Sequence, residues 1–122
     1  MSTITYLAAP YSHPSAVMRE LRFNAVNTAA ADLMRKGHVV FSPISHSHCV
    51  ARDNALPVGW KFWRRQDFAL LAVCDYMIVM KLDGWRESVG VQAEIARAEE
   101  LGIPVAYIEP PLDTRAEQEG AG

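Results

Sequence analysis

The sequence predicts a small α/β protein, a three-layer sandwich in which helices cover both faces of a parallel sheet of four or five strands. Short apolar runs alternate along the chain with longer stretches whose apolar residues recur at helical spacing. The third run, DYMIVMKL, shows no polar alternation, which indicates a strand covered on both faces. Strands that alternate with helices favour parallel pairing through right-handed crossovers. We therefore expect a flavodoxin-like or Rossmann-like sheet with the strand order 2-1-3-4.

The first half of the chain is expected to hold two strands and one long helix. Residues 3–9, TITYLAA, predict a buried strand. Ser15 is expected to cap a helix that Gly37 ends directly after two basic residues. Residues 38–43, HVVFSP, predict a second strand. The Ser-, His- and Asn-rich segment that follows, to about Pro57, is expected to be a loop.

The second half repeats the alternation of helix and strand. Residues 60–74, WKFWRRQDFALLAVC, carry apolar side chains at helical spacing, and residues 75–82 follow as the third strand. Residues 88–101 predict another helix, which Gly102 ends. Residues 104–109, PVAYIE, predict a fourth strand.

The size of the chain suits one domain. A length of 122 residues leads us to expect a single α/β domain over residues 1–109, with residues 110–122 as a tail that is mobile or docked on a partner subunit. The net charge of −2 gives no electrostatic footprint for DNA or RNA. Apolar runs are too short to cross a membrane, and the start lacks signal-peptide features. Cys49 and Cys74 fit neither a metal motif nor a disulfide framework, so a reducing cytoplasm is expected.

Glu94 departs most from an ordinary helical residue. It borders the apolar stripe of Val91 and Ile95, whereas most helical glutamates face solvent. It lies one turn after Gly90, so its carboxylate is expected over a position without a side chain. A carboxylate beside the core requires a partner or a shifted pKa. We therefore expect Glu94 and Gly90 to belong to a functional site.

The switch point of the predicted sheet lies between its first and third strands, where ligands bind in such folds. The loops that follow these strands are APYSHPS and DGWRES. Ser88 is expected to cap the next helix, where free amide groups would suit an anion, although a plain cap is the simpler alternative. Trp85 could stack on a base, although packing in the core or an interface is simpler. The polar groups expected in the crevice are Tyr6, Tyr11, Ser12, His13, Asp83, Ser88 and Glu94.

The carboxylates of this crevice indicate glycosyl chemistry. As a nucleophile, Glu94 could attack the anomeric carbon of a sugar, and the Tyr6 hydroxyl could orient it. Asp67 is either a solvated helix residue beside Arg64 and Arg65 or, if its helix end faces the crevice, a group that binds or protonates a leaving base.

Metal and cofactor motifs are weak or absent in the sequence. His46 and His48 stand two residues apart beside Cys49, a weak zinc pattern without a second pair of ligands. Hydrogen bonds to a substrate explain these histidines more simply, so we expect no metal and keep His46 as a substrate-binding candidate. Neither a G-x-G-x-x-G motif after the first strand nor a P-loop motif is present, so no cofactor is expected.

Several of these motifs resemble a known family. YLAAPYS near the start, an aspartate at the head of the third strand and S-x-G-x-x-x-E at the next helix resemble nucleoside 2-deoxyribosyltransferases and their hydrolase relatives. The resemblance covers about residues 4–108, and SPISHSH and LDGWRESVGVQAEI are most similar to a small uncharacterised branch of that superfamily. It implies that Glu94 is the nucleophile, that Tyr6 donates a hydrogen bond to it, and that Asp67 lies on the base side.

Ser88 bears on the substrate that the resemblance implies. Transferases of unphosphorylated nucleosides tend to carry an aspartate there, whereas relatives that hydrolyse nucleoside 5′-monophosphates tend to carry a serine, which does not repel a phosphate. The resemblance thus implies an N-glycosidase that cleaves the base–sugar bond of a nucleoside 5′-monophosphate or similar nucleotide. A nucleoside 2-deoxyribosyltransferase and a non-catalytic nucleotide-binding protein are the alternatives. It also implies a homo-oligomer whose neighbouring subunit closes the site.

Overall fold

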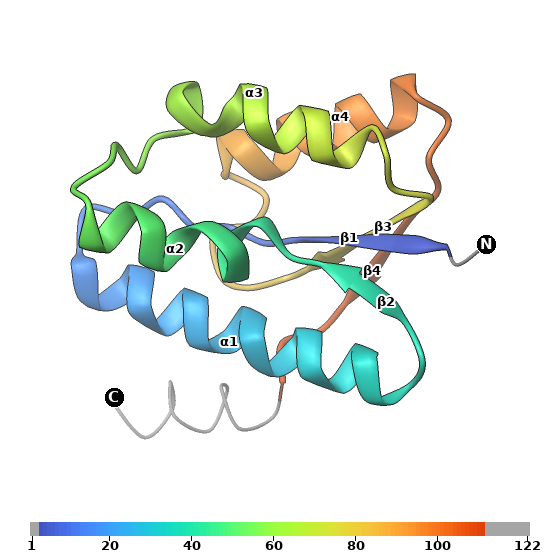
Figure 1. Cartoon of the computed structure of the whole chain (residues 1–122), viewed down its shortest axis with the longest axis horizontal. Helices are drawn as coiled ribbons and strands as arrows, with labels where there is room; N and C mark the ends of the chain where they lie inside the picture. Colours follow the sequence, from blue (N-terminus) through green and yellow to red (C-terminus); the bar gives the residue numbers. More distant parts are fainter. Residues whose placement is uncertain (1–2, 112–122) are drawn as a thin grey trace.

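A four-stranded parallel sheet forms the middle layer of the protein (Figure 1). The computed structural model describes residues 3–111. The strands lie in the order β2-β1-β3-β4, which confirms the predicted order 2-1-3-4. In the central pair, Tyr6 of β1 is in register with Met77 of β3. The bounds are β1 (Ile4–Ala8), β2 (Val39–Phe41), β3 (Tyr76–Met80) and β4 (Val105–Ile108).

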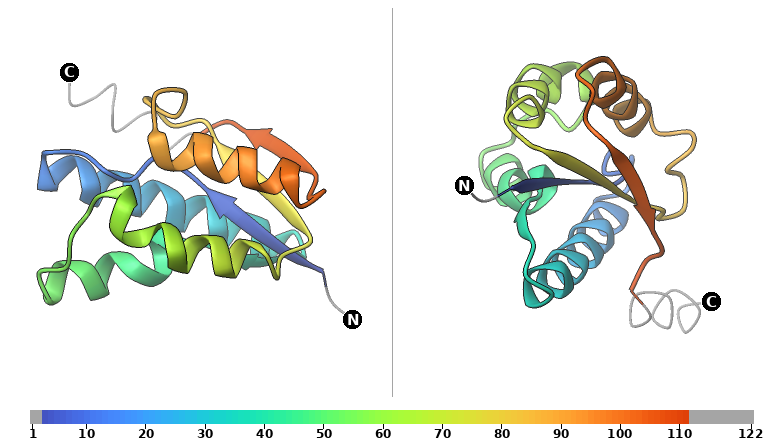
Figure 2. Two further views of the ribbon diagram at one scale, coloured as in Figure 1. Left: turned by 90° about the horizontal axis from the view of Figure 1, so that it is seen from above. Right: turned by 90° about the vertical axis from the view of Figure 1, so that its right-hand side faces the viewer.

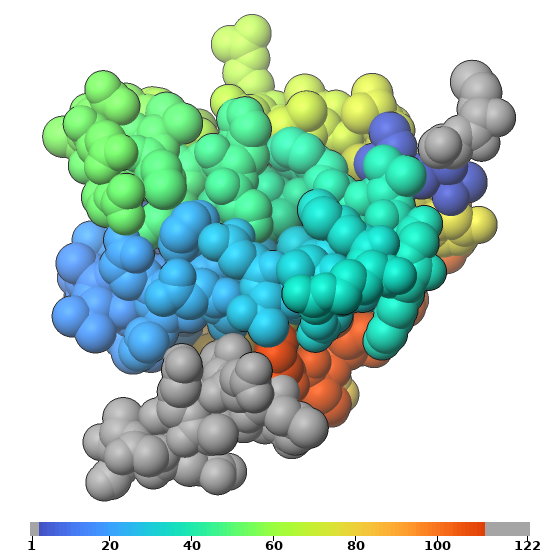
Figure 3. Space-filling view, turned by 60° about the horizontal axis from the view of Figure 1, so that its bottom comes forward, coloured from blue at the N-terminus to red at the C-terminus, as the bar shows by residue number. Residues whose placement is uncertain are grey.

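Two helices pack on each face of the sheet, so the predicted three-layer sandwich is confirmed (Figure 2). Helices α1 (Ala16–Arg35) and α2 (Pro43–Asp53) cover one face, and α3 (Trp60–Leu71) and α4 (Val89–Glu100) cover the other. Each face has its own apolar core, because successive strand residues point to opposite sides. The view in Figure 3 shows the face built by α1, with α2 beside it.

The first helix begins and ends where the sequence predicts. The Ser15 hydroxyl accepts a hydrogen bond from the backbone N–H of Met18 at 3.3 Å, as an N-cap does. Gly37 follows the C-cap with a φ angle of 95°, a conformation that glycine adopts without strain. Signals in the local sequence therefore mark both ends of this helix.

The segment after β2 contradicts the prediction, because the expected loop is helix α2. Ser42 is its N-cap and accepts a hydrogen bond from the Ser45 N–H at 3.1 Å, while Pro43 occupies the first turn. A Ser-Pro pair that closes a strand can thus also open a helix. The inward positions keep helical spacing, but two of the five are polar, so apolar periodicity does not reveal the helix. These positions are Pro43, Ile44, Ser47, His48 and Ala51.

The remaining sequence predictions concern the tail, the cysteines and the membrane. Residues 112–122, most of the predicted tail, lie outside the described residues, and the domain boundary at residue 109 stays a prediction. Cys74 is a buried free thiol and Cys49 a half-buried one. Within residues 3–111, none of the helices has the length and apolar character needed to span a bilayer.

Candidate active site

A pocket of about 710 Å³ opens at the carboxyl ends of the strands, a volume within the range of small-molecule sites. Residues that follow β1 and β3 contribute to its wall, together with the first turns of α3 and α4. The pocket therefore occupies the switch point between β1 and β3. The sequence candidates that line it are Tyr11, Ser12, Asp67, Ser88, Gly90 and Glu94.

Glu94 lies in the pocket wall with only 5% of its surface exposed. Its carboxylate accepts a hydrogen bond from the hydroxyl of Tyr6. Burial raises the pKa of Glu94 to about 8; the negative charge of Asp67 adds to this rise, and the Tyr6 hydrogen bond opposes it. At neutral pH the folded protein therefore holds a carboxyl group poised between its two protonation states.

Tyr6 lies behind Glu94 on β1 and is completely buried. Burial, followed by the charge of Glu94, raises the pKa of the Tyr6 phenol far above its ordinary value. The phenol is therefore protonated at every physiological pH and can act as the donor to Glu94. This fixes the direction of the hydrogen bond and holds the carboxylate in one orientation.

Asp67 lies in the pocket wall on α3, and its burial excludes the alternative of a solvated helix residue. Burial raises the pKa of its carboxyl group to about 6. Among the described residues, none offers a hydrogen bond to its buried Oδ1 atom. Buried carboxylate oxygens are normally paired, so this atom is available to a ligand in the pocket.

The structure corrects the prediction for the space above Gly90. A Cβ atom at this position would lie 3.2 Å from Cε3 of Trp60, so the indole ring occupies the space expected to lie under Glu94. Trp60 lines the pocket and packs edge-on against Phe68, with 5.4 Å between ring centroids. Glycine is needed at position 90 because an aromatic ring from another helix approaches the backbone.

Ser88 is the N-cap of α4, as predicted, and accepts a hydrogen bond from the Val91 N–H at 3.2 Å. Ser88 also lines the pocket, so the free amide groups of the first turn of α4 lie at its wall. The predicted N-cap of α4 is thus present in the structure. The binding of an anionic ligand by these amide groups stays a prediction.

Three cations at the pocket were missed by the sequence reasoning: Arg22, Lys61 and Arg64 all line it. Arg22 donates hydrogen bonds to the backbone oxygens of Ser12, at 2.9 Å, and Asp83, at 3.2 Å. It therefore ties the loop after β1 to the loop after β3. Such cations give no pattern in the sequence, because they lie on polar helix faces where charged residues are common.

His13 and Asp83 do not line the pocket. The Nδ1 atom of His13 accepts a hydrogen bond from the Ser15 N–H at 3.0 Å, so the ring belongs to the start of α1. Asp83 offers its backbone oxygen to Arg22, and its residue surface is exposed. Both follow strand ends as predicted, but local hydrogen bonding and solvent determine where they point.

Trp85 and His46 also lie outside the pocket wall. Trp85 packs near Tyr107 of β4, with 5.5 Å between ring centroids, and matches the packing alternative rather than a base-stacking role. His46 is exposed and lies near Phe41, while His48 lines the pocket. On a helix, residues two apart differ by about 200°, so only one of these histidines can face inward.

The described part of the chain contains no cluster of three or more His, Cys, Asp or Glu side chains that could hold a metal ion. The titratable groups of the pocket are instead carboxylates, a phenol, a histidine and cations. Such a set is suited to nucleophilic and acid–base chemistry on a small molecule.

The fold is that of the 2-deoxyribosyltransferases. The solved 2-deoxyribosyltransferase of the psychrotolerant bacterium Bacillus psychrosaccharolyticus matches 88% of this chain and 72% of its own, with a TM-score of 0.56 and 24% sequence identity. The resemblance predicted from the sequence is confirmed at the level of the fold. The family model described as "Domain of unknown function (DUF1937)" matches residues 3–109, and the chain belongs to this family. None of the curated proteins matches this chain.

Proposed function

We propose that this protein is an N-glycosidase that cleaves the base–sugar bond of a nucleoside 5′-monophosphate or similar nucleotide. The observation that carries the proposal is the Glu94 carboxylate, buried in a pocket at the switch point and held by the Tyr6 hydroxyl. A carboxylate fixed in this way is suited to attack on an anomeric carbon. The fold shared with a 2-deoxyribosyltransferase supports the same class of bond.

The first chemical step is attack of a Glu94 oxygen on C1′ of the sugar. The bond between C1′ and the base nitrogen breaks, and its electron pair leaves with the base. Asp67, whose Oδ1 has no partner within residues 3–111, receives the base and assists its departure by a hydrogen bond or a proton. Glu94 must be ionised for this attack, and with a pKa of about 8 roughly one molecule in ten meets that condition at pH 7.

The second step is attack of water on the glycosyl-enzyme, which releases the sugar phosphate and restores Glu94. The phosphate is accommodated where α4 begins, at the Ser88 cap and the free amide groups of the first turn. Lys61 and Arg64 at the pocket wall supply positive charge for it. This combination supports a phosphorylated substrate over an unphosphorylated nucleoside.

Deoxyribosyl transfer between two bases is the second candidate function. It uses the same nucleophile and differs only in whether a base or water attacks the intermediate. The solved protein with a similar fold is described as a 2-deoxyribosyltransferase, and this favours sugar transfer as the alternative. Nucleotide binding without turnover is the third candidate, because a shared fold does not guarantee shared chemistry.

A chromatographic assay of base release tests the proposal. Purified protein is incubated with ribo- and deoxynucleoside 5′-monophosphates and with the matching nucleosides, in parallel with Glu94→Ala. The exposed Glu99 of the same helix gives a matched control, Glu99→Gln. We expect free base from the wild type and the control but not from Glu94→Ala. Full activity of Glu94→Ala would exclude Glu94 as the nucleophile.

Two additions to this assay separate the other candidates. A second base in the mixture yields a new nucleoside only if the protein transfers the sugar. A nucleotide that binds and survives hours of incubation supports binding without turnover. For the phosphate site, Lys61→Gln with Arg64→Gln is expected to raise KM for the monophosphate about tenfold or more and to leave that of the nucleoside unchanged.

We also infer that the protein is a cytoplasmic homo-oligomer with one domain over residues 1–109. The two free cysteines support a reducing compartment. Sedimentation of the full chain and of a chain ending at residue 109 would show whether the tail contributes to assembly.

A further inference from the structure

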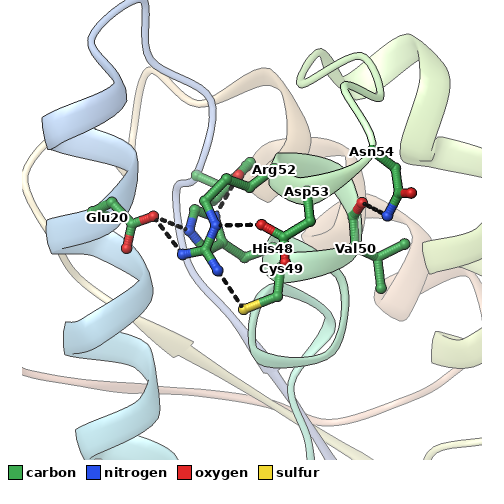
Figure 4. Close-up of polar contacts among 8 residues, drawn as sticks. Glu20, His48, Cys49, Val50, Arg52, Asp53 and Asn54 are labelled. Atoms are coloured by element: carbon green, nitrogen blue, oxygen red, sulfur yellow. Dashed lines mark hydrogen bonds and ion pairs between the residues drawn. The ribbon is translucent and has the colours of Figure 1, made fainter.

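Three residues beside the pocket form a hydrogen-bonded chain that the reaction described above does not use. The Tyr11 hydroxyl lies 2.7 Å from Nδ1 of His48, and Nε2 of His48 lies 2.7 Å from Oε1 of Glu20. Tyr11 and His48 line the pocket, and Glu20 is on α1. Figure 4 shows the second half of this chain, where Arg52 of α2 also donates to the same Glu20 oxygen at 3.0 Å.

The chemistry of Glu20 determines the direction of both hydrogen bonds. The hydrogen bonds from His48, and then from Arg52, hold the pKa of the Glu20 carboxyl below its usual range. An ionised carboxylate can only accept, so Nε2 of His48 carries a proton. In the neutral imidazole, Nδ1 is then an acceptor, and the Tyr11 hydroxyl must donate to it.

The imidazole of His48 is held firmly in this position. It is 4% exposed and stacks on the ring of Phe23, with 4.3 Å between centroids. At one end of this series of hydrogen bonds, Tyr11 lines the pocket. At the other end, the Glu20 side chain is 40% exposed. A proton taken up at Tyr11 thus has a continuous path through His48 to a carboxylate in contact with solvent.

The helices that carry His48 and Glu20 lie on the opposite side of the sheet from the nucleophile Glu94. Glu94 and Asp67 belong to α4 and α3, whereas Glu20 and His48 belong to α1 and α2 on the other face. In a double displacement, water must attack C1′ from the side opposite the Glu94 ester. That is the face the base has just left, so the water needs a base other than Glu94 on the pocket wall; Tyr11, from the loop after β1, and His48, from α2, both line that wall.

We propose that Tyr11, His48 and Glu20 form a proton relay that activates the water in the second step; this rests on the proposed function. The water oxygen bonds to C1′, and the bond between C1′ and the Glu94 oxygen breaks, which returns the carboxylate. The water proton passes to the Tyr11 oxygen as the phenolic proton passes to Nδ1 of His48. Glu20 stabilises the resulting imidazolium and takes the proton from its Nε2, and the exposed Glu20 carboxyl then releases this proton to solvent.

The charges around Tyr11 are consistent with this order of transfers. The ionisable groups that act on its phenol electrostatically are Arg19 and Glu20 from α1 and Arg52 and Cys49 from α2. Burial raises the pKa of the Tyr11 phenol despite the two arginines. A free phenolate is therefore not formed, and Tyr11 needs His48 as the acceptor of its proton. Tyr11 is the catalytic residue of the relay, and His48 and Glu20 are positioning residues.

Rapid quenching with a nucleotide substrate tests the relay, because base release reports the first step and sugar-phosphate release the second. Tyr11→Phe keeps the ring but removes the hydroxyl. We expect a burst of base within about threefold of the wild-type rate, followed by turnover slowed about 10²-fold or more. The glycosyl-enzyme should accumulate on Glu94 and be visible by mass spectrometry of the intact chain.

Glu20→Gln tests the positioning role. Its amide can donate to Nε2 and thereby place the proton of His48 on Nδ1, which then cannot accept from Tyr11. We expect slowed turnover of at least about tenfold with an unchanged burst. The control is Asp32→Asn, which removes an exposed acidic partner of Arg35 on the same helix and should leave both rates unchanged.

Chemical rescue separates catalysis from a merely structural role. Azide is an anion that can attack C1′ without losing a proton, so it should restore turnover of Tyr11→Phe and yield a glycosyl azide. Wild-type turnover by Tyr11→Phe, or a lost burst without accumulated intermediate, overturns the relay while the proposed function stands. Silence of the wild type on every nucleotide overturns the proposed function, and the relay with it.

Discussion

Tyr6 on β1 and Glu94 on α4 form a buried hydrogen bond between side chains 88 residues apart. Alternation along β1 turns the Tyr6 side chain toward the layer of α3 and α4, where it meets the second turn of α4. Burial makes the ionised form of Glu94 costly, and the phenol recovers part of that cost. The pair therefore keeps a reactive carboxylate in place at the expense of fold stability, as active sites commonly do.

Replacing Glu94 with glutamine should stabilise the fold increasingly as pH rises. The pKa of Glu94 is about 8 in the folded protein and near 4.5 when solvated. Below pH 4.5 both states are protonated, so Glu94 carries no penalty. Between these values the unfolded chain loses its proton first, so wild-type stability falls with rising pH. The free energy of unfolding of Glu94→Gln should therefore gain on the wild type by a few kcal/mol between pH 5 and 8.

Urea unfolding at pH 5, 6.5 and 8 measures this trend. The amide of glutamine has its own pH-independent packing cost, so the informative quantity is how the difference between the two proteins changes with pH. Glu99→Gln makes the same change at an exposed position of α4 and controls for the substitution itself. A constant difference between wild type and Glu94→Gln would show that Glu94 titrates like a solvated carboxyl.

Replacing Tyr6 with phenylalanine should shift the pH dependence of activity to higher pH. The Tyr6 hydrogen bond lowers the pKa of Glu94, so its loss raises that pKa further. The nucleophile must be ionised, so kcat/KM should fall about tenfold or more at pH 7, and the limb of the pH profile that reports Glu94, near pH 8 in the wild type, should move upward. The half-exposed Tyr107 provides the control Tyr107→Phe. An equal loss at every pH would mean that Tyr6 acts otherwise than through the ionisation of Glu94.

The sequence was sufficient for most of the fold because its strands are apolar runs and two of its helices have serine N-caps that could be recognised. Helix α2 was not predicted, because its inward face carries Ser47 and His48 in place of apolar side chains. The same error led to His46 being favoured over His48, since a loop gives no rule for which of two neighbouring histidines points inward.

The site was predictable where an unusual residue interrupts a regular pattern, and not otherwise. Glu94 stands out because it borders an apolar stripe, and Tyr6 because it lies near the end of a buried strand. Arg22 interrupts no pattern on its helix. The reason for Gly90 is a contact with Trp60 of another helix, and such tertiary contacts are not encoded in local spacing.

The pH profile of the wild type should report the role of Asp67. Burial places the pKa of Asp67 at about 6 and that of Glu94 at about 8. If Asp67 donates a proton to the base, activity needs protonated Asp67 and ionised Glu94, and kcat/KM should be bell-shaped with limbs near these two values. If Asp67 acts as a carboxylate, kcat/KM should rise through both values and then level off.

Asp67→Asn with two kinds of substrate decides between these roles. A sugar phosphate with a nitrophenolate leaving group needs no proton on departure. We expect Asp67→Asn to lose about 10²-fold in kcat on the natural nucleotide and little on the nitrophenyl substrate. Equal losses on both would show that Asp67 positions the sugar and not the base.

Adding a methyl group at position 90 should reduce catalytic activity more than it reduces the stability of the fold. Alanine improves helix propensity by about 1 kcal/mol over glycine, but its Cβ would lie 3.2 Å from Cε3 of Trp60. The indole ring, which lines the pocket, must move by a few tenths of an ångström. We expect Gly90→Ala to lower kcat/KM severalfold while the free energy of unfolding stays within about 1 kcal/mol of the wild type.

A double-mutant cycle with Trp60→Leu tests the cause of this loss. Leucine lacks the ring edge that the new methyl group would meet, so Gly90→Ala should cost little activity when Trp60 is already leucine. The single variant Trp60→Leu shows how much kcat/KM falls when the indole ring alone is lost. If the two substitutions instead lower kcat/KM additively, the effect of Gly90→Ala comes from the backbone of α4, and Trp60 does not transmit it.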